Sequence, residues 1–143
     1  METARPHRWR DVALAAAIAL LLSAVWALRD WPALSALNLP DTDDVVRLQQ
    51  IRDWLGGQAF GDLAQHQLGI GGVEMHWSRL PDLVPAAIII LLTPIAGSHA
   101  AELTAVIAWP ALLFVTALAL VGSIARALKT SAPTAIVVAA LAY

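Results

Sequence analysis

The chain contains no cysteine, which removes several kinds of chemistry at once. Without thiols there is no disulfide, no zinc–thiolate centre and no thiol nucleophile. Charged residues are also scarce, at 14% of 143 residues, whereas a soluble domain carries about a quarter. The net charge is −2, and no run of Lys or Arg interleaves with aromatic residues. The sequence therefore has no signature of a nucleic-acid partner.

Apolar residues make up 59% of the sequence and are gathered in blocks. The first block, residues 12–28, would span about 25 Å as a helix, near the lower limit for crossing a bilayer. Trp9, Trp26 and Trp31 lie near its ends, where tryptophans anchor a span at the membrane interface. We expect a transmembrane helix at 12–28, preceded by an N-terminal segment at 1–11. A cleaved signal peptide is the alternative, which bulky Trp26 and the later apolar segments disfavour.

Charge is distributed unevenly along the chain. Arg5, Arg8 and Arg10 lie in the first ten residues, whereas residues 29–82 hold eight acids against four arginines. The positive-inside rule then places residues 1–11 in the cytoplasm and the acidic loop 29–82 outside. The expected location is the bacterial inner membrane, so the outer side is the periplasm.

Two further apolar runs follow the acidic loop. Residues 83–97 are interrupted by two prolines, and residues 101–126 form a longer run. If both runs crossed, Arg126 and Lys129 would lie outside, whereas they lie in the cytoplasm if only the second crosses. The positive-inside rule favours the second arrangement. We expect 83–97 to be an interfacial or juxtamembrane helix and 101–126 to be the second transmembrane helix.

The last apolar run, residues 132–143, is too short to cross a bilayer. We interpret it as the start of a third transmembrane helix, and the chain as a fragment of a longer polytopic membrane protein. Within the outer loop, helical spacing of apolar residues predicts an amphipathic helix at about 43–55. Residues 56–73, rich in glycine and polar groups, are predicted to be loop. The expected fold is all-α: two full spans, a truncated third, and short amphipathic or juxtamembrane helices outside.

Three aspartates, Asp41, Asp43 and Asp44, open the predicted amphipathic helix. Helix capping and the helix dipole would explain one or two of them, but three within four positions exceed that need. Carboxylate oxygens suit Mg²⁺ or Mn²⁺, so a metal or catalytic role stands beside the capping role. Arg79 and Arg47 are candidates for a bidentate contact with a phosphate, and contact with lipid headgroups is the alternative for Arg79.

Other arrangements have less support from their spacing. His66, Glu74 and His76 could supply nitrogen and oxygen ligands, but they match no zinc pattern, and surface hydrogen bonding is the simpler role for both histidines. Ser78 lacks the context of a nucleophile elbow. Trp77 is interpreted as an interfacial anchor.

The order of these parts resembles a known family. A cytoplasmic N-terminus and one span lead to an outer loop that opens with an acidic motif and continues into Arg-Asp-Trp-Leu-Gly-Gly at 52–57. A Gly-rich turn, a Pro-flanked apolar segment and a second span follow. This order is similar to the N-terminal module of the GT-C superfamily of membrane glycosyltransferases, nearest to the catalytic subunit of oligosaccharyltransferases. That family places its metal-binding catalytic acid nine residues before an Arg-Asp-x-x-x-Gly segment, as Asp43 precedes Arg52 here.

The resemblance covers roughly residues 10 to 130, and it has departures. Val45 and Val46 replace the family's aromatic residue after the acid, and residues 73–81 stand where many relatives carry a Tyr-Pro-x-Gly type of turn. The family's second acidic loop and soluble C-terminal domain are absent from this sequence, so the piece alone is expected to be inactive.

The resemblance implies transfer of a sugar from a polyprenyl-phosphate-linked donor to an acceptor on the outer side. It assigns Asp43 the catalytic, metal-binding role, with Asp41 and Asp44 as neighbouring ligands of a divalent cation, and the remainder of a longer chain and membrane lipids as partners. The alternative is a non-enzymatic membrane anchor or assembly subunit with an acidic docking loop. A transporter is disfavoured, because both spans lack ionisable residues between their ends.

Overall fold

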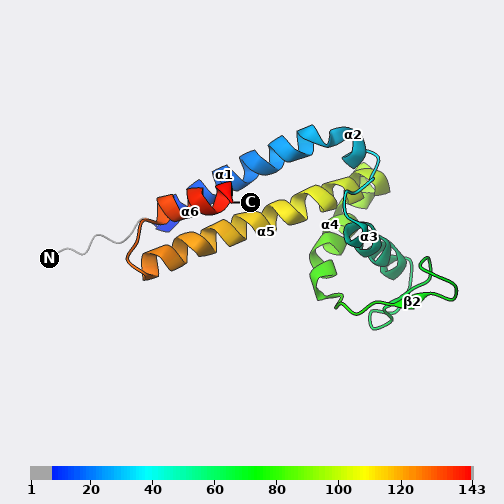
Figure 1. Ribbon diagram of the computed structural model, residues 1–143. Coiled ribbons are helices and arrows are strands. Elements are labelled where there is room, and N and C mark those ends of the chain that lie inside the picture. The colour runs from blue at the N-terminus through cyan, green and yellow to red at the C-terminus, as the bar shows by residue number, and fades with distance from the viewer. Residues whose placement is uncertain (1–7, 143) are drawn as a thin grey trace. The chain divides into compact units, whose positions relative to one another are not determined.

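The computed structural model describes residues 8–142, and they are mostly helical. Helix accounts for 72% of the chain and strand for 3%, which confirms a mostly helical class. The helices are α1 (Arg8–Arg29), α2 (Trp31–Leu34), α3 (Thr42–Leu55), α4 (Leu83–Ala96), α5 (Ser98–Ala127) and α6 (Ala132–Leu141) (Figure 1). A 3₁₀ turn, η1, spans Leu80–Asp82, and two short strands are β1 (Ala64–Gln65) and β2 (Val73–Glu74).

Two of these helices, α1 with 22 residues and α5 with 30, are long and apolar enough to cross a membrane. They contain the ranges 12–28 and 101–126 for which the sequence predicts spans. The finding rests on length and composition, so placement in a bilayer stays a prediction. Helix α6 has 10 residues and begins at Ala132, within the range predicted to start a third span.

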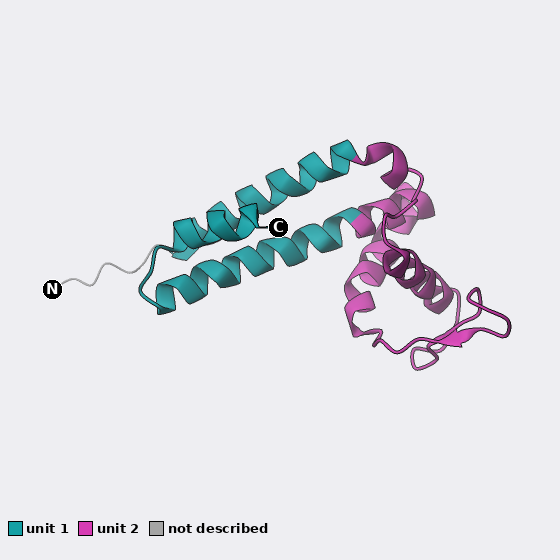
Figure 2. Cartoon of the chain, in the orientation of Figure 1, with its two compact units in different colours: residues 1–29, 107–143 teal, residues 30–106 magenta. Residues whose placement is uncertain are grey.

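The chain divides into two compact units, which we describe separately (Figure 2). Unit 1 consists of residues 1–29 and 107–143, and unit 2 consists of residues 30–106. Helix α5 contributes to both, because the division falls within it. Unit 1 is therefore assembled from two segments of sequence, and unit 2 from one.

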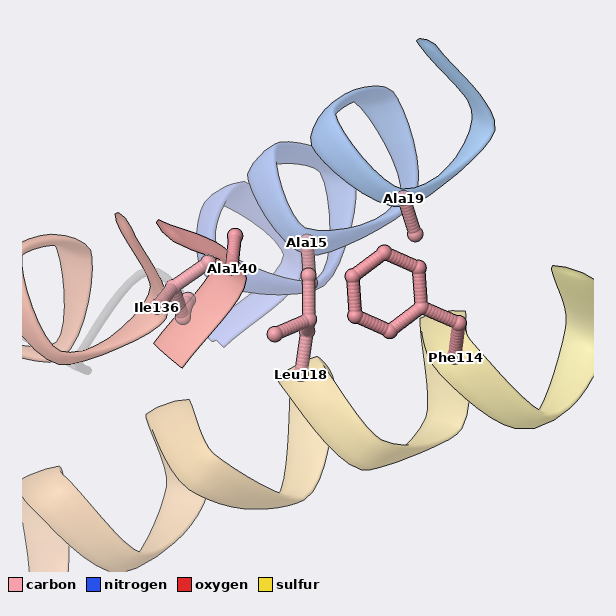
Figure 3. Close-up of a cluster of buried hydrophobic side chains, with 6 residues drawn as sticks. All are labelled: Ala15, Ala19, Phe114, Leu118, Ile136 and Ala140. Atoms are coloured by element: carbon pink, nitrogen blue, oxygen red, sulfur yellow. The ribbon is translucent and has the colours of Figure 1, made fainter. Parts of the chain in front are cut away.

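The core of unit 1 is built on small residues of α1 (Figure 3). Ala15 and Ala19 are completely buried and lie one helical turn apart. Phe114 and Leu118 of α5 and Ile136 of α6 pack in the same cluster. Because alanine has no side-chain atom beyond Cβ, its helix surface lets neighbouring helices approach closely.

An ion pair closes one end of unit 1. Asp11, in the first turn of α1, accepts hydrogen bonds from the guanidinium of Arg126, in the last turn of α5. Asp11 is buried, so this pair matches charge where solvent is largely excluded. The start of α1 therefore lies beside the end of α5, and the two helices run antiparallel within unit 1 (Figure 1).

Gly122 of α5 lies in close contact with α6. A Cβ atom added there would stand 2.8 Å from Cδ1 of Ile136, whose side chain is fully buried. We expect Gly122→Val to destabilise unit 1 by about 1–3 kcal/mol, because overpacking forces side chains or helices to shift. Ile136→Val deletes Cδ1, so the Gly122→Val effect should shrink in that background. Chemical denaturation of the four proteins measures this coupling, and equal effects in both backgrounds would contradict the close contact.

Unit 2 is organised around α3. The helix begins after Pro40, which cannot continue a helix backwards, and ends before Gly57, whose φ of +114° favours glycine. Its bounds lie within one residue of the predicted 43–55. One face of α3 joins a core with residues of α4 and α5, consisting of Leu48, Ile51, Ala86, Ile89, Ala101 and Ala105. A bidentate contact from Arg52 to Glu102, at 3.0 and 2.6 Å, also joins α3 to α5 within this unit.

The loop predicted at residues 56–73 is wrong in one respect, because it contains β1 and the first residue of β2. The two strands pair antiparallel, with Ala64 opposite Glu74 and Gln65 opposite Val73. Each strand has only two residues, which is too few to show the alternation of apolar and polar residues by which strands are recognised in a sequence. The pairing brings the segment around Ala64 beside the segment around Glu74, and both segments contribute to a pocket.

Candidate functional site

The acidic cluster lies at the start of α3, and its three members differ in their contacts. Asp41 is the N-cap: its backbone is extended, and its Oδ1 accepts a hydrogen bond of 2.8 Å from the backbone N–H of Asp43. Asp43 and Asp44 occupy the first turn, where the positive end of the helix dipole favours carboxylates. All three residues are exposed. Capping therefore accounts for Asp41, while the side chains of Asp43 and Asp44 have no capping role.

The carboxylates of this cluster repel one another. Partial desolvation raises the pKa of Asp44, the charge of Asp41 raises it further, and the positive charge of Arg47 opposes both. Within residues 8–142, no group of three or more acidic or histidine side chains converges as a ready-made metal site. Mg²⁺ commonly takes one or two protein carboxylates together with substrate phosphates and water, and the exposed pair Asp43 and Asp44 matches that donor set.

Arg47, one turn further along α3, is held by two partners within unit 2. Its Nη1 donates to Oδ1 of Asp82 at 2.6 Å, and its guanidinium lies over the Trp77 ring, 5.1 Å from the ring centroid. Asp82 is completely buried. A phosphate at Arg47, as predicted from the sequence, would have to compete with these partners.

Arg79 is buried, with only 2% of its surface exposed. Its Nη1 donates to the backbone carbonyl of Gln50 at 2.8 Å, and its Nη2 donates to Oε1 of Gln58 at 2.7 Å and to the carbonyl of Asp62. The guanidinium thus joins α3 to the segment that follows it. The sequence-based prediction of a phosphate contact at Arg79 stays a prediction, and the contacts described here give this side chain a structural role.

The buried carboxyl group of Asp82 makes the stability of unit 2 depend on pH. Desolvation raises the pKa of Asp82 above 3.8, although the hydrogen bond and charge of Arg47 and the charge of Arg79 oppose this. A raised pKa in the folded state means that folding favours the protonated acid. The contribution of Asp82 to stability is therefore fully present below pH 3.8 and is lost as pH rises through the folded-state pKa.

Lowering the pH should accordingly increase the stability of the wild type relative to that of Asp82→Asn. We expect the difference in unfolding free energy between the two proteins to shift toward the wild type as pH falls from neutral to 3.8. Asp62 has the opposite tendency, because the backbone N–H of Ala64 lowers its pKa, but it is common to both proteins. Denaturant midpoints measured across this range test the prediction, and a pH-independent difference would contradict it.

A pocket of about 400 Å³ lies beside Arg79 and was not predicted from the sequence. Its lining comes from two segments, one after α3 and one after β2: Phe60, Gly61, Leu63, His76, Trp77, Ser78 and Arg79. The sequence had separated His76, Ser78 and Trp77 into metal, nucleophile and anchor roles. No local spacing links Phe60 to the later segment, since the β1–β2 pairing, the backbone hydrogen bond from Met75 to Leu63 and the contacts of Arg79 bring the two segments together.

Comparisons with protein-family models, curated proteins and solved structures found no match to this chain. The resemblance to GT-C glycosyltransferases therefore rests on the sequence motifs alone.

Proposed function

We propose that this chain is the N-terminal part of an integral-membrane glycosyltransferase of GT-C type. The enzyme would transfer a sugar from a polyprenyl-phosphate-linked donor to an acceptor on the outer side of a bacterial inner membrane. The observation that carries the proposal is the exposed position of Asp43 and the lack of contacts to its side chain within the described residues. Its side chain is exposed on the first turn of α3, makes no hydrogen bond or ion pair with any described residue, and lies nine residues before Arg52.

The contacts of unit 1 support a two-span topology. The Asp11–Arg126 ion pair joins the first turn of α1 to the last turn of α5. Two spans that run in opposite directions bring these ends to one side of a membrane, whereas a third crossing between them would separate the ends. Arg8 and Arg10 also belong to the first turn of α1, and Lys129 follows α5, so basic residues gather at the end proposed to be cytoplasmic.

The outward face of α4 supports an interfacial placement for residues 83–97. Pro85, Ala86 and Ile89 of this helix are buried within unit 2. Several of its other large apolar side chains are exposed, among them Leu91 at 70% and Ile95 at 84%. A helix with both an inner and an outer apolar face suits contact with protein on one side and with membrane lipid on the other.

Asp43 is assigned the catalytic role by this proposal, with Asp44 beside it and Asp41 holding the helix start. A divalent cation, Mg²⁺ or Mn²⁺, held by the carboxylates of Asp43 and Asp44 would neutralise charge on the departing phosphate. The exposed position of Asp43 leaves room for a substrate oxygen on the same ion. Positive charge from Arg47, one turn away, would lie near the same phosphate.

Reporter fusions test the arrangement on which the proposal depends. Fusions after residues 60 and 98 should be active only as periplasmic reporters, and a fusion after residue 130 only as a cytoplasmic reporter. The three results together place the acidic cluster outside and keep 83–97 from crossing. A cytoplasmic reading at residue 60 would put Asp43 on the wrong side of the membrane and remove the proposed function.

A membrane anchor or assembly subunit is the second candidate, and the capping contact of Asp41 favours it. In that case the acids would serve as helix caps and as a surface for docking a partner. An assay of sugar transfer by the full-length protein separates the candidates, because only the glycosyltransferase turns over a lipid-linked donor.

A further inference from the structure

The pocket beside Arg79 has two aromatic walls whose rings are fixed by neighbouring side chains. Phe60 packs against Trp54, with ring centroids 5.2 Å apart and an edge-on angle of 67°. Trp77 carries the guanidinium of Arg47 over its ring, and its indole N–H donates to Oε1 of Gln50. Both rings are thus held before any ligand arrives, so binding would cost little ordering entropy.

The polar side chains at the mouth of the pocket keep unused hydrogen-bonding capacity. Ser78 Oγ accepts the backbone N–H of Leu80 at 3.1 Å, which leaves its own O–H free to donate. His76 is exposed, and its ring nitrogens bond to no side chain or carbonyl in the described part of the chain. The imidazole supplies both a donor and an acceptor in its neutral form.

The charged group in the pocket wall, the guanidinium of Arg79, has both terminal nitrogens occupied, and its Nε is buried. Both terminal nitrogens of Arg79 donate to carbonyl oxygens of Gln50, Gln58 and Asp62, so the guanidinium does not offer a bidentate fork to an anion. No Asp or Glu lines the pocket, so a cationic ligand would find no counter-charge there. The pocket therefore suits a neutral ligand.

We propose that this pocket binds a neutral saccharide ring. The C–H groups on one face of a pyranose match the electron-rich face of an aromatic ring, and its hydroxyls match Ser78 and His76. A volume of about 400 Å³ lies within the range of small-molecule sites, roughly 300–1,000 Å³. The inference rests on the proposed function for the origin of the saccharide, which would be the lipid-linked donor or a glycan acceptor.

Saturation-transfer NMR on the chain in lipid nanodiscs tests the proposal. Glycoside detergents must be avoided, because their headgroups are themselves saccharides. We expect saturable transfer to at least one of the methyl glycosides of glucose, galactose, mannose and N-acetylglucosamine, and no competition by inorganic phosphate. Phe60→Leu removes an aromatic wall and Ser78→Ala removes a hydroxyl, and each should weaken binding roughly tenfold, the effect of about 1.4 kcal/mol.

Trp31→Leu is the matched control, because it removes an exposed aromatic ring that does not line the pocket and should leave binding unchanged. Helicity and thermal unfolding of each variant report whether unit 2 remains folded. If Phe60→Leu is unfolded, Ser78→Ala tests the proposal in its place. The proposal is overturned if no glycoside saturates, if phosphate displaces the glycoside, or if folded pocket variants bind as the wild type does.

A sugar-transfer assay of the full-length protein, set beside the glycoside-binding measurement, separates this inference from the proposed function. Glycoside binding without transfer would retain the pocket and reject the glycosyltransferase. Transfer that survives in a protein with no measurable glycoside binding would do the reverse.

Discussion

Asp43→Asn in the full-length protein is expected to lower sugar transfer on the order of 100- to 1,000-fold, the usual cost of removing a group that stabilises charge in the transition state. The amide keeps the size of the side chain but loses the negative charge that would hold a divalent cation. Transfer from a labelled polyprenyl-phosphate-linked sugar, measured in membranes, checks the prediction.

The fold should tolerate this substitution. The backbone N–H of Asp43, rather than its side chain, makes the capping contact with Asp41. Helicity and thermal unfolding should therefore match the wild type, so that lost transfer reports chemistry. Asp41→Asn is a matched control, since asparagine caps helices as well as aspartate does.

The three aspartates can be distinguished by the same assay. Full activity in Asp43→Asn together with loss in Asp44→Asn would move the catalytic role by one residue. Full activity in all three single variants would remove the acidic cluster from the mechanism and favour the anchor or assembly subunit.

Arg79→Met is expected to destabilise unit 2 strongly. The substitution keeps an unbranched apolar side chain but leaves the buried carbonyl oxygen of Gln50, and the partly buried oxygens of Gln58 and Asp62, without their donor. A buried polar group that loses its partner costs about 1–3 kcal/mol and a partly buried one costs less, so the loss is a sizeable part of the roughly 5–15 kcal/mol stability of a typical domain. Hydrogen exchange and limited proteolysis across residues 30–106 provide the measurement.

Two further arginine substitutions calibrate this result. Arg79→Lys keeps the charge but loses the planar fork, so it should destabilise unit 2 less than methionine does. Arg52→Met removes an arginine of the same unit whose side chain is 40% exposed, and its loss should cost no more than about 1 kcal/mol. Equal stability of Arg79→Met and Arg52→Met would show that the buried contacts of Arg79 do not hold the unit together.

The helices could be predicted from sequence because their signals are local. Apolar spacing predicted a helix at about 43–55, and α3 spans Thr42–Leu55. The range 83–97 likewise corresponds to α4 at Leu83–Ala96. Hydrophobic periodicity and helix-end signals depend only on residues that are close in sequence, so no knowledge of tertiary contacts was needed.

The contacts of the candidate site could not be predicted, because they join distant positions. Arginine is usually exposed, so Arg79 was assigned to a ligand, yet its partner carbonyl on Gln50 lies 29 residues earlier in the chain. The buried Asp82 takes its partner Arg47 from 35 residues away. The helix-capping alternative for Asp41 was visible in sequence, since that contact spans two residues.

The Asp11–Arg126 ion pair constrains the order in which the two units can fold during synthesis. Its partners lie 115 residues apart, so at about 5–20 residues per second the ribosome needs roughly ten seconds to supply the arginine after the aspartate. All of residues 30–106 are translated within that interval. Unit 2 can therefore fold first. Helix α1 is synthesised early, but Asp11 has no ion-pair partner until Arg126 has been translated.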